Sequence, residues 1–284
     1  MRLATFNILH GQSVTGPMSS PDAHLQSTTL GPETATELEA AIRTLDADVV
    51  AIQEADVNQP RSGHTNQPEA VARAMAAVDS CFVPTVIGTP GGAEGFRSST
   101  AEERDAAADG NGHGRRYGVA LASRYPVVAW RREVFEPAPL SLPLLVQLDG
   151  RPKMLKVPDE QRAAIAATIE APWGLFTVAT AHLSFVPGYN VKQLRQIRRW
   201  LTGLPRPLVL MGDFNLPSPI PARITRWDSV LRAPSFPAYR PRVQFDHILV
   251  DGISPDALER MRAGAQAVAL PISDHCAMTA RLEL

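Results

Sequence analysis

The sequence predicts an α/β protein in which mixed β-sheets pack together with helices outside them, in a single domain over residues 1–284. Predicted strands outnumber predicted helices, and hairpins alternate with strand–helix–strand units. The chain has 284 residues, of which 44% are hydrophobic and 20% charged, so it is long enough to bury a large core. No internal repeat stands out at the periods typical of solenoids.

The first part of the chain alternates strands with helices. The first strand ends at Asn7, and a long polar loop from His10 to Gly31 follows it. A helix starts at Pro32, with acidic residues early, where the helix dipole favours them. The next elements are a strand at 48–54 that is almost wholly apolar until Gln53 and Glu54, a helix at 67–78 and a strand at 82–87.

Two unusual segments follow. Gly88–Arg116 is rich in glycine and polar residues, which is typical of a disordered loop or of a flexible rim over a site. Residues 117–122 and 127–134 predict a hairpin around the turn at 123–126. We interpret the proline-rich stretch Pro137–Pro158 as a long connection, because strands resume after it with the same pattern.

The second half contains further strands and one amphipathic helix. That helix spans Tyr189–Leu201, and a loop-rich stretch covers 220–242. The predicted strands are 163–170, 175–181, 208–212, 243–250, 265–270 and 276–284.

The stretch Leu208–Asn215 is the one around which the rest of the chain is organised. Four apolar residues predict a short buried strand that ends at Gly212. Because side chains alternate along extended backbone, Asp213 and Asn215 can point the same way while Phe214 packs inward. An acceptor beside an amide suits a general base with an oxyanion or metal contact. A simple turn is the alternative, because Gly, Asp and Asn are common turn residues.

Polar residues recur where the apolar strands stop, and each also has a structural explanation such as a turn cap, a solvated strand end or a core histidine. A buried Asp246 needs a partner, because its strand is otherwise apolar. Oxygen ligands with few histidines select Mg²⁺ or Mn²⁺ over zinc, and an Asp–His pair beside a second Asp and an Asn fits attack of activated water on a phosphoester. The set comprises Asn7, Glu54, His182, Asp213, Asn215, Asp246, His247, Asp274 and His275.

These residues lie in six short motifs, which are Thr5-Phe6-Asn7, Ala51-Ile52-Gln53-Glu54, Thr180-Ala181-His182, Gly212-Asp213-Phe214-Asn215, Phe245-Asp246-His247-Ile248 and Ser273-Asp274-His275. Their order from residue 2 to residue 284 resembles the endonuclease/exonuclease/phosphatase superfamily, which includes deoxyribonuclease I-like nucleases, abasic-site endonucleases, neutral sphingomyelinases and inositol polyphosphate 5-phosphatases.

The resemblance implies a four-layered α/β sandwich, with two packed mixed β-sheets flanked by helices and the site at the top of the sheets. It implies that Asn7 and Glu54 belong to an Mg²⁺ or Mn²⁺ site, with Glu54 as the principal metal carboxylate. Asp274 resembles the acid that assists the metal or the leaving group.

The resemblance also assigns the catalytic groups. Asp213 is similar to the residue that orients and deprotonates the attacking water, and Asn215 lies beside it on the phosphate. His275 resembles the histidine that contacts the scissile phosphate, Asp246 the carboxylate that orients it, and His182 a second phosphate-binding histidine.

The motifs narrow the branch of the family. His182-Leu183-Ser184-Phe185 departs from the Tyr-x-Pro-Asn pattern of abasic-site endonucleases, and Arg242–Ile248 departs from the inositol 5-phosphatase signature. An endonuclease-type phosphodiesterase acting on nucleic acid therefore leads, with a lipid or small-molecule phosphodiesterase of sphingomyelinase-like type as the alternative. Arg61 is a candidate phosphate contact or a solvated loop arginine. Three helix arginines either track a nucleic-acid backbone or form a solvated face, and these are Arg195, Arg198 and Arg199.

A non-catalytic binding module on the same scaffold is a further alternative. Such a protein should have lost some of four residues, yet Glu54, Asp213, Asp274 and His275 are all present. The net charge of −1 gives no global basic field that attracts nucleic acid.

The cysteine content and the hydropathy exclude disulfide-rich, cysteine-cluster and membrane-spanning proteins. The two cysteines, Cys81 and Cys276, form neither a disulfide framework nor a metal cluster. No apolar run approaches the roughly 20 residues of a membrane span, so we expect no stable membrane insertion. Met1 leads directly into a strand and not into a signal peptide, so we expect a cytoplasmic monomer.

Overall fold

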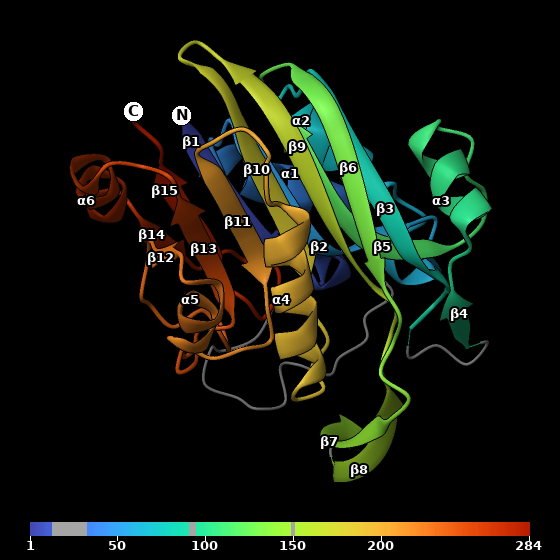
Figure 1. Cartoon of the computed structure of the whole chain (residues 1–284). Coiled ribbons are helices and arrows are strands. Elements are labelled where there is room, and N and C mark those ends of the chain that lie inside the picture. Colours follow the sequence, from blue (N-terminus) through green and yellow to red (C-terminus); the bar gives the residue numbers. More distant parts are fainter. Residues whose placement is uncertain (13–32, 91–94, 149–150) are drawn as a thin grey trace.

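Two β-sheets lie face to face in the computed structural model, which describes residues 1–12, 33–90, 95–148 and 151–284. One sheet has seven strands and the other has six, and helices cover both outer faces (Figure 1). This arrangement confirms the predicted four-layered α/β sandwich. The predicted polar loop at 10–31 lies outside the described residues beyond Gln12.

The seven-stranded sheet brings the two ends of the chain together, because the first strand pairs with the last one, antiparallel, and with the second one, parallel. In spatial order its strands are β14 (Gln266–Val268), β15 (Ala277–Arg281), β1 (Arg2–Asn7), β2 (Val49–Val57), β5 (Arg116–Ser123), β3 (Asp79–Gly88) and β4 (Phe96–Ser98).

The six-stranded sheet also contains one parallel pair, β10 with β11, in which His182 lies opposite Asp213. Since the parallel pairs β1–β2 and β10–β11 both end at the same side of the sandwich, their terminal polar residues meet there. In spatial order its strands are β12 (Asp228–Ser229), β13 (Asp246–Asp251), β11 (Leu208–Asp213), β10 (Gly174–His182), β9 (Arg162–Ala171) and β6 (Val127–Phe135).

The helices form the outer layers. The seven-stranded sheet is covered by α1 (Glu33–Leu45) and α2 (Gln67–Ala74), and the six-stranded sheet by α4 (Tyr189–Trp200) and α5 (Ile220–Thr225). At the two ends of the sandwich lie α3 (Ala101–Ala108) and α6 (Pro255–Ala263) (Figure 1). Short 3₁₀ turns cover Leu9–Gly11 and Pro60–Ser62. Across the described residues, every helix is too short or too polar to cross a membrane.

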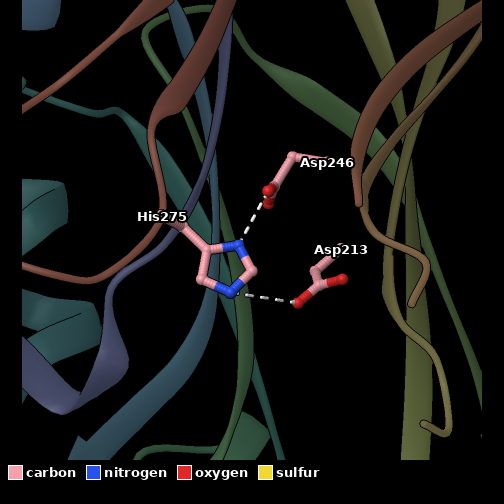
Figure 2. Close-up of side chains that lie close together, drawn as sticks. All are labelled: Asp213, Asp246 and His275. Atoms are coloured by element: carbon pink, nitrogen blue, oxygen red, sulfur yellow. Dashed lines mark hydrogen bonds and ion pairs between the residues drawn. The ribbon is translucent and has the colours of Figure 1, made fainter. Parts of the chain in front are cut away.

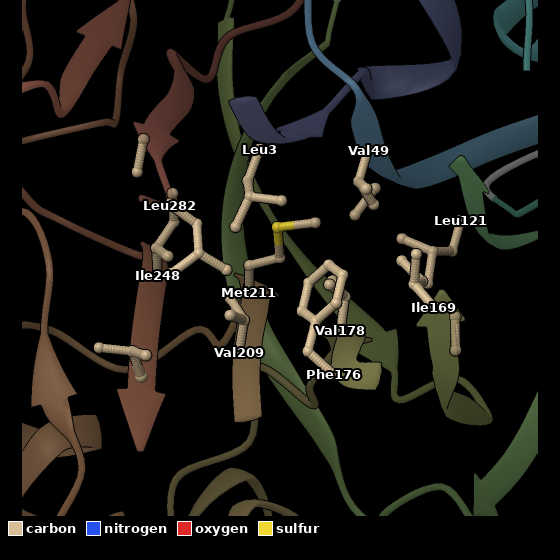
Figure 3. Packing of buried hydrophobic residues seen from close by; sticks show 14 of the residues in the cluster. Leu3, Val49, Leu121, Ile169, Phe176, Val178, Val209, Met211, Ile248 and Leu282 are labelled. Atoms are coloured by element: carbon tan, nitrogen blue, oxygen red, sulfur yellow. The ribbon is translucent and has the colours of Figure 1, made fainter. Parts of the chain in front are cut away.

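The central core fills the space between the sheets (Figure 3). Strand β11 shows why its sequence is uniformly apolar: Val209 and Met211 face this core, while Leu208 and Leu210 face the cluster under α4. The strand is therefore buried on both faces, and its first polar side chain, Asp213, comes where it leaves the core.

The predicted hairpin between residues 117–122 and 127–134 is wrong. Strand β5 belongs to the seven-stranded sheet and β6 to the six-stranded sheet. Both edges of β5 are already paired, with β2 and with β3, so β6 pairs instead with β9. The turn at 123–126 therefore carries the chain from one sheet to the other.

Two predicted loops contain regular structure. Within Gly88–Arg116, the described residues include β4 and α3, and α3 begins with a capping box between Thr100 and Glu103. Within Pro137–Pro158, β7 (Ser141–Leu148) and β8 (Arg151–Pro158) form a two-stranded hairpin that projects from the sandwich (Figure 1). The loop predictions for these two segments relied on their glycine and proline content. The apolar and capping residues beside those glycines and prolines nevertheless form strands and a helix.

Candidate active site

At the carboxyl end of β11, the backbone adopts conformations that suit the glycine and asparagine found there. Gly212 has a φ of +147°, and a Cβ there would lie 2.1 Å from the carbonyl oxygen of Ala181 on β10. Asn215 has a φ of 48°, a left-handed conformation that asparagine tolerates. Its N–H donates to Asp213 Oδ1 at 2.9 Å, so one carboxylate oxygen closes a turn and leaves Oδ2 for the site. The turn interpretation of this motif is therefore correct, and its role as a general base with an oxyanion or metal contact stays a prediction.

Asn7 joins carboxylates from the two sheets. Its Nδ2 donates to Glu54 Oε1 at 3.0 Å and to Asp213 Oδ2 at 3.0 Å. Glu54 lies in a β-bulge between Ile52 and Ala55 with a φ of 60°, and β2 continues beyond it to Val57. The strand therefore does not end at Glu54, as the sequence suggested, because the bulge is what places this carboxylate in the site.

His275 lies between two buried aspartates (Figure 2). Its Nδ1 is 2.7 Å from Asp246 Oδ2, and its Nε2 is 3.9 Å from Asp213 Oδ2. Burial lowers the pKa of His275, but the charge and hydrogen bond of Asp246 outweigh it and hold that pKa well above its usual value. Burial raises the pKa of Asp213 to about 7, with Asp246 adding to the rise and the His275 charge opposing it.

His182 ends β10 and completes the cluster. Its Nε2 is 3.7 Å from Asp213 Oδ2, 4.0 Å from Glu54 Oε1 and 3.4 Å from Asn215 Nδ2. Burial, then the charges of Arg162 and His275, lower the pKa of His182 well below its usual value, so this imidazole is neutral.

Arg162 is a site residue that the sequence reasoning missed. It begins β9, and its Nη1 lies 3.1 Å from His182 Nδ1 and 3.2 Å from Nε2. Its side chain is only 6% exposed. Burial lowers its pKa, but Glu160 and other neighbouring negative groups raise it overall, so the cation persists inside the site.

Of the other predicted polar residues, Asp274 lies at the edge of this cluster and His247 lies apart from it. Asp274 lies beside His275, with its Oδ1 4.0 Å from His275 Nε2. His247 points to the outer face, where it stacks on Phe214 and its Nε2–H donates to the backbone carbonyl oxygen of Leu216 at 2.8 Å. Burial lowers the pKa of His247 to about 4.

Arg61 is bound by Asp56, which lies close to it in the sequence. Its guanidinium makes two bonds of 2.8 Å to the buried Asp56 carboxylate and one of 3.0 Å to the carbonyl of Pro90. Its side chain is 23% exposed. The structure thus shows how Arg61 is held in place, and its contact with a substrate phosphate stays a prediction.

The oxygen atoms around Asn7 fit a hard divalent cation. Glu54 Oε1 and Asp213 Oδ2 converge on one nitrogen, and carboxylate oxygens are the ligands that Mg²⁺ and Mn²⁺ prefer. Ligand atoms of Asp213, Asp246 and His275 also lie within 4.8 Å of one another. In that second group the 2.7 Å bond occupies Nδ1 of His275, which favours an oriented imidazole over a ligand set. Asn7 Oδ1 accepts from the N–H of Leu9 at 3.1 Å, so the amide would have to turn for its oxygen to bind an ion.

Polar residues tie the two sheets together just below this cluster. Gln53 Nε2 donates to Thr5 Oγ1 at 3.1 Å within its own sheet and to Thr180 Oγ1 at 3.0 Å in the other. All three side chains are buried. The site therefore stands on a hydrogen-bonded connection between the sheets.

The sequence and the fold both match known proteins. Residues 4–275 match the model of the Endonuclease/Exonuclease/phosphatase family. An endonuclease/exonuclease/phosphatase from Beutenbergia cavernae has a similar structure, with a TM-score of 0.57 and 20% identity over 99% of this chain and 71% of that one. No curated protein sequence matches the chain significantly.

Two further solved structures share the fold. The beta toxin of Staphylococcus aureus with bound magnesium ions gives a TM-score of 0.60 at 13% identity, over 99% of each chain. The mannosyl-6-phosphatase of Bacteroides thetaiotaomicron gives a TM-score of 0.56 at 13% identity, over 100% of each chain.

Proposed function

The chain belongs to the Endonuclease/Exonuclease/phosphatase family of phosphoester hydrolases, and from this premise we propose that it is a divalent-metal-dependent phosphodiesterase. The observation that carries the proposal is the convergence of Asn7, His182 and His275 on one oxygen of Asp213, at 3.0, 3.7 and 3.9 Å. These groups come from both sheets and meet at one carboxylate, which is the arrangement needed to activate a water next to an anion.

Asp213 is the group that takes the proton of the attacking water. Its Oδ1 is held by the N–H of Asn215, so the carboxylate cannot rotate freely and Oδ2 stays in the site. The Nδ2 group of Asn215 lies on the same side, 3.4 Å from His182 Nε2, and would contact the phosphate.

The two histidines and Arg162 receive the negative charge of the phosphate. His275 is held by Asp246 with Nε2 directed at the site, and it is protonated at neutral pH because Asp246 raises its pKa. His182 is neutral and lies against the guanidinium of Arg162. A protonated imidazole and a buried guanidinium stabilise the additional charge of the transition state.

A divalent cation is the expected cofactor. Glu54 together with Asn7 would hold Mg²⁺ or Mn²⁺ beside Asp213, and the ion would neutralise charge on the phosphoryl oxygens. The magnesium ions in the beta toxin of the same fold support this choice.

The described surface gives nucleic acid less support than the sequence suggested. The arginines of α4 are exposed, but that helix starts near the site at Tyr189 and runs away from it, so Arg198 and Arg199 are in its last turn. We therefore place a small-molecule or lipid phosphodiester ahead of a polynucleotide as the substrate.

The proposal is tested by hydrolysis of bis(4-nitrophenyl) phosphate and nicking of supercoiled plasmid in millimolar Mg²⁺ or Mn²⁺. Asp213→Asn and EDTA should each abolish turnover, while Asp109→Asn at the exposed C-cap of α3 should not change it. Turnover that survives both Asp213→Asn and EDTA would overturn the mechanism. Binding without turnover of either compound would favour a non-catalytic module.

A further inference from the structure

A cavity lies at the edge of the seven-stranded sheet, where α3 stands beside β3 (Figure 1). Its volume is about 510 Å³, which is within the range of small-molecule pockets in proteins. Residues of β2, β3 and β5 form its floor, and residues of α2, of α3 and of β6 from the other sheet form its walls. The cavity is therefore enclosed by elements of both sheets and two helices.

The cavity lies on the face of β5 that is turned away from the catalytic residues. Arg61 lies over the ring of Tyr117, and burial raises the pKa of Tyr117 well above its usual value, with the charge of Glu54 adding to the rise. The Tyr117 side chain thus faces the candidate active site. Because side chains alternate along a strand, the preceding residue, Arg116, points to the other face, where it lines the cavity.

Small side chains and a helix without buried residues leave this space open. Residues of α3 line the cavity, yet none of the eight residues of this helix is buried. Helices in proteins are stabilised mainly by packing one face against their neighbours, so α3 has apolar surface left to cover. Five of the lining residues are alanines, and these are Ala72, Ala107, Ala108, Ala120 and Ala122.

Arg116 supplies a positive charge to the cavity without a counter-ion. Its side chain makes no hydrogen bond or ion pair with any residue that the structure describes, and its Nε is buried without a partner. Burial lowers the pKa of Arg116, and no described carboxylate opposes this effect. The second arginine of the lining, Arg132, is neutralised by Asp105, whose Oδ1 lies 3.2 Å from its Nη2. An anionic group on a ligand would therefore pair with Arg116.

The charges of the lining favour a single negative charge on the ligand. Only one of the two arginines lacks an acidic partner among the described residues, and Glu69, an exposed residue of the same lining, would repel a second negative charge. A guanidinium pairs with a carboxylate through two parallel N–H donors. A monoanionic carboxylate therefore fits this cavity better than a dianionic phosphate.

The remaining lining suits an apolar chain. Val71 of α2, Phe82 of β3 and Trp130 of β6 contribute apolar surface from three sides. Burial of such surface against a ligand is favourable because it removes apolar area from water.

From these features we propose that the cavity binds an amphipathic carboxylate, with the carboxylate on Arg116 and the apolar chain between α2, α3 and the sheet. A fatty acid is the simplest molecule of this class. The proposal does not depend on the phosphodiesterase function, because the residues that carry it lie outside the catalytic cluster.

The test measures displacement of a fluorescent fatty acid, dansylaminoundecanoic acid, by decanoate below its critical micelle concentration. The wild type should bind the probe, and decanoate should displace it at least about tenfold more effectively than decanol or decylamine, because only the carboxylate pairs with the guanidinium. Arg116→Met removes the charge but keeps an apolar stem, so it should weaken decanoate binding about tenfold and leave decanol within about twofold. The matched control is Arg223→Met on the exposed side of α5, and it should change neither ligand.

A second variant tests the location of the ligand. Ala107→Trp places a large side chain on the α3 wall, so it should weaken decanoate and decanol together by about tenfold, with an unchanged circular dichroism spectrum as the check of folding. Lack of probe binding by the wild type, equal displacement by decanoate and decylamine, or equal decanoate binding by Arg116→Met would overturn the proposal. Unchanged binding by folded Ala107→Trp would place the ligand elsewhere and overturn it as well. If Ala107→Trp does not fold, the comparison of Arg116→Met with Arg223→Met decides.

Discussion

Asp246 and His275 are 29 residues apart in the chain and come from different sheets, yet Asp246 Oδ2 and His275 Nδ1 lie 2.7 Å apart. Asp246 opens β13 of the six-stranded sheet, and His275 precedes β15 of the seven-stranded sheet. This contact fixes the imidazole so that its other nitrogen faces Asp213. The orientation and the protonation of His275 therefore both depend on one carboxylate.

Replacing Asp246 by Asn should lower the pKa of His275, because the negative charge that opposes the effect of burial is lost. In the metal-free wild type, the raised pKa of His275 contributes stability that is fully present below about pH 6.5 and is lost as the pH rises through the folded-state value. The variant should lack this contribution. Titration of the histidine Cε1–H signals by NMR with EDTA present measures the shift, with His64, exposed on a surface loop, as the internal control. An unchanged His275 pKa would contradict the assigned pair.

Asp213→Asn should reduce kcat/KM by about a hundredfold or more, which is typical for loss of a general base. It should not reduce stability at pH 8, because the wild-type carboxyl has a pKa of about 7 caused chiefly by burial, and its ionisation in the core costs free energy above that pH. Thermal unfolding of the metal-free proteins at pH 8 measures the difference. A variant that loses both activity and several degrees of Tm would mean that Asp213 serves the fold.

Arg162→Lys should lower activity although it keeps the positive charge. Lysine cannot present the planar set of N–H donors that contacts His182 and faces Asp159. Phosphate or sulfate inhibition of the variant should weaken by about tenfold if the guanidinium binds the anion. Arg195→Lys on the exposed face of α4 is the matched control, and an equal loss in both variants would exclude a specific role for Arg162.

Gly212→Ala should destabilise the fold by about 2 kcal/mol or more, because its Cβ would lie 2.1 Å from the Ala181 carbonyl oxygen in a strained backbone conformation. Gly264→Ala is the control, since the nearest atom to its Cβ would be at 3.7 Å. Urea denaturation compares the two free energies of unfolding. Equal values would show that β10 and β11 can separate without cost.

Local pattern predicted much of the site. Asp213 and Asn215 lie together and Phe214 lies in the core as predicted, but a left-handed turn at Asn215 brings them together and not an extended backbone. Apolar strands ending in polar residues located Asn7 and His182, because these strands run in parallel pairs whose carboxyl ends meet. The sheet architecture likewise followed from the order of strands and helices.

The features of the fold and the site that the sequence did not predict depend on which strands pair. Arg162 lies at the amino end of β9, whereas the predicted site residues lie at the carboxyl ends of strands. Because β9 runs antiparallel to β10, its amino end reaches the site, where Ala163 lies opposite His182. The failed hairpin at 117–134 has the same origin, because the partners of β5 are distant in sequence. Charge types do not reveal ion pairs either, because the contact that holds Arg61 against Asp56 depends on how the loop after β2 folds back.

The site above the hydrogen bond from Gln53 to Thr180 is built from both sheets and exists only in the folded protein, so occupancy and folding should be thermodynamically linked. Asn7 and Glu54 belong to the seven-stranded sheet, and Asp213 and His182 belong to the six-stranded sheet. A ligand that contacts both pairs of residues therefore opposes separation of the two sheets. Such a ligand at a hundred times its dissociation constant would add about 2.7 kcal/mol to the free energy of unfolding. The melting temperature of the whole sandwich is thus a direct readout of what binds at its edge.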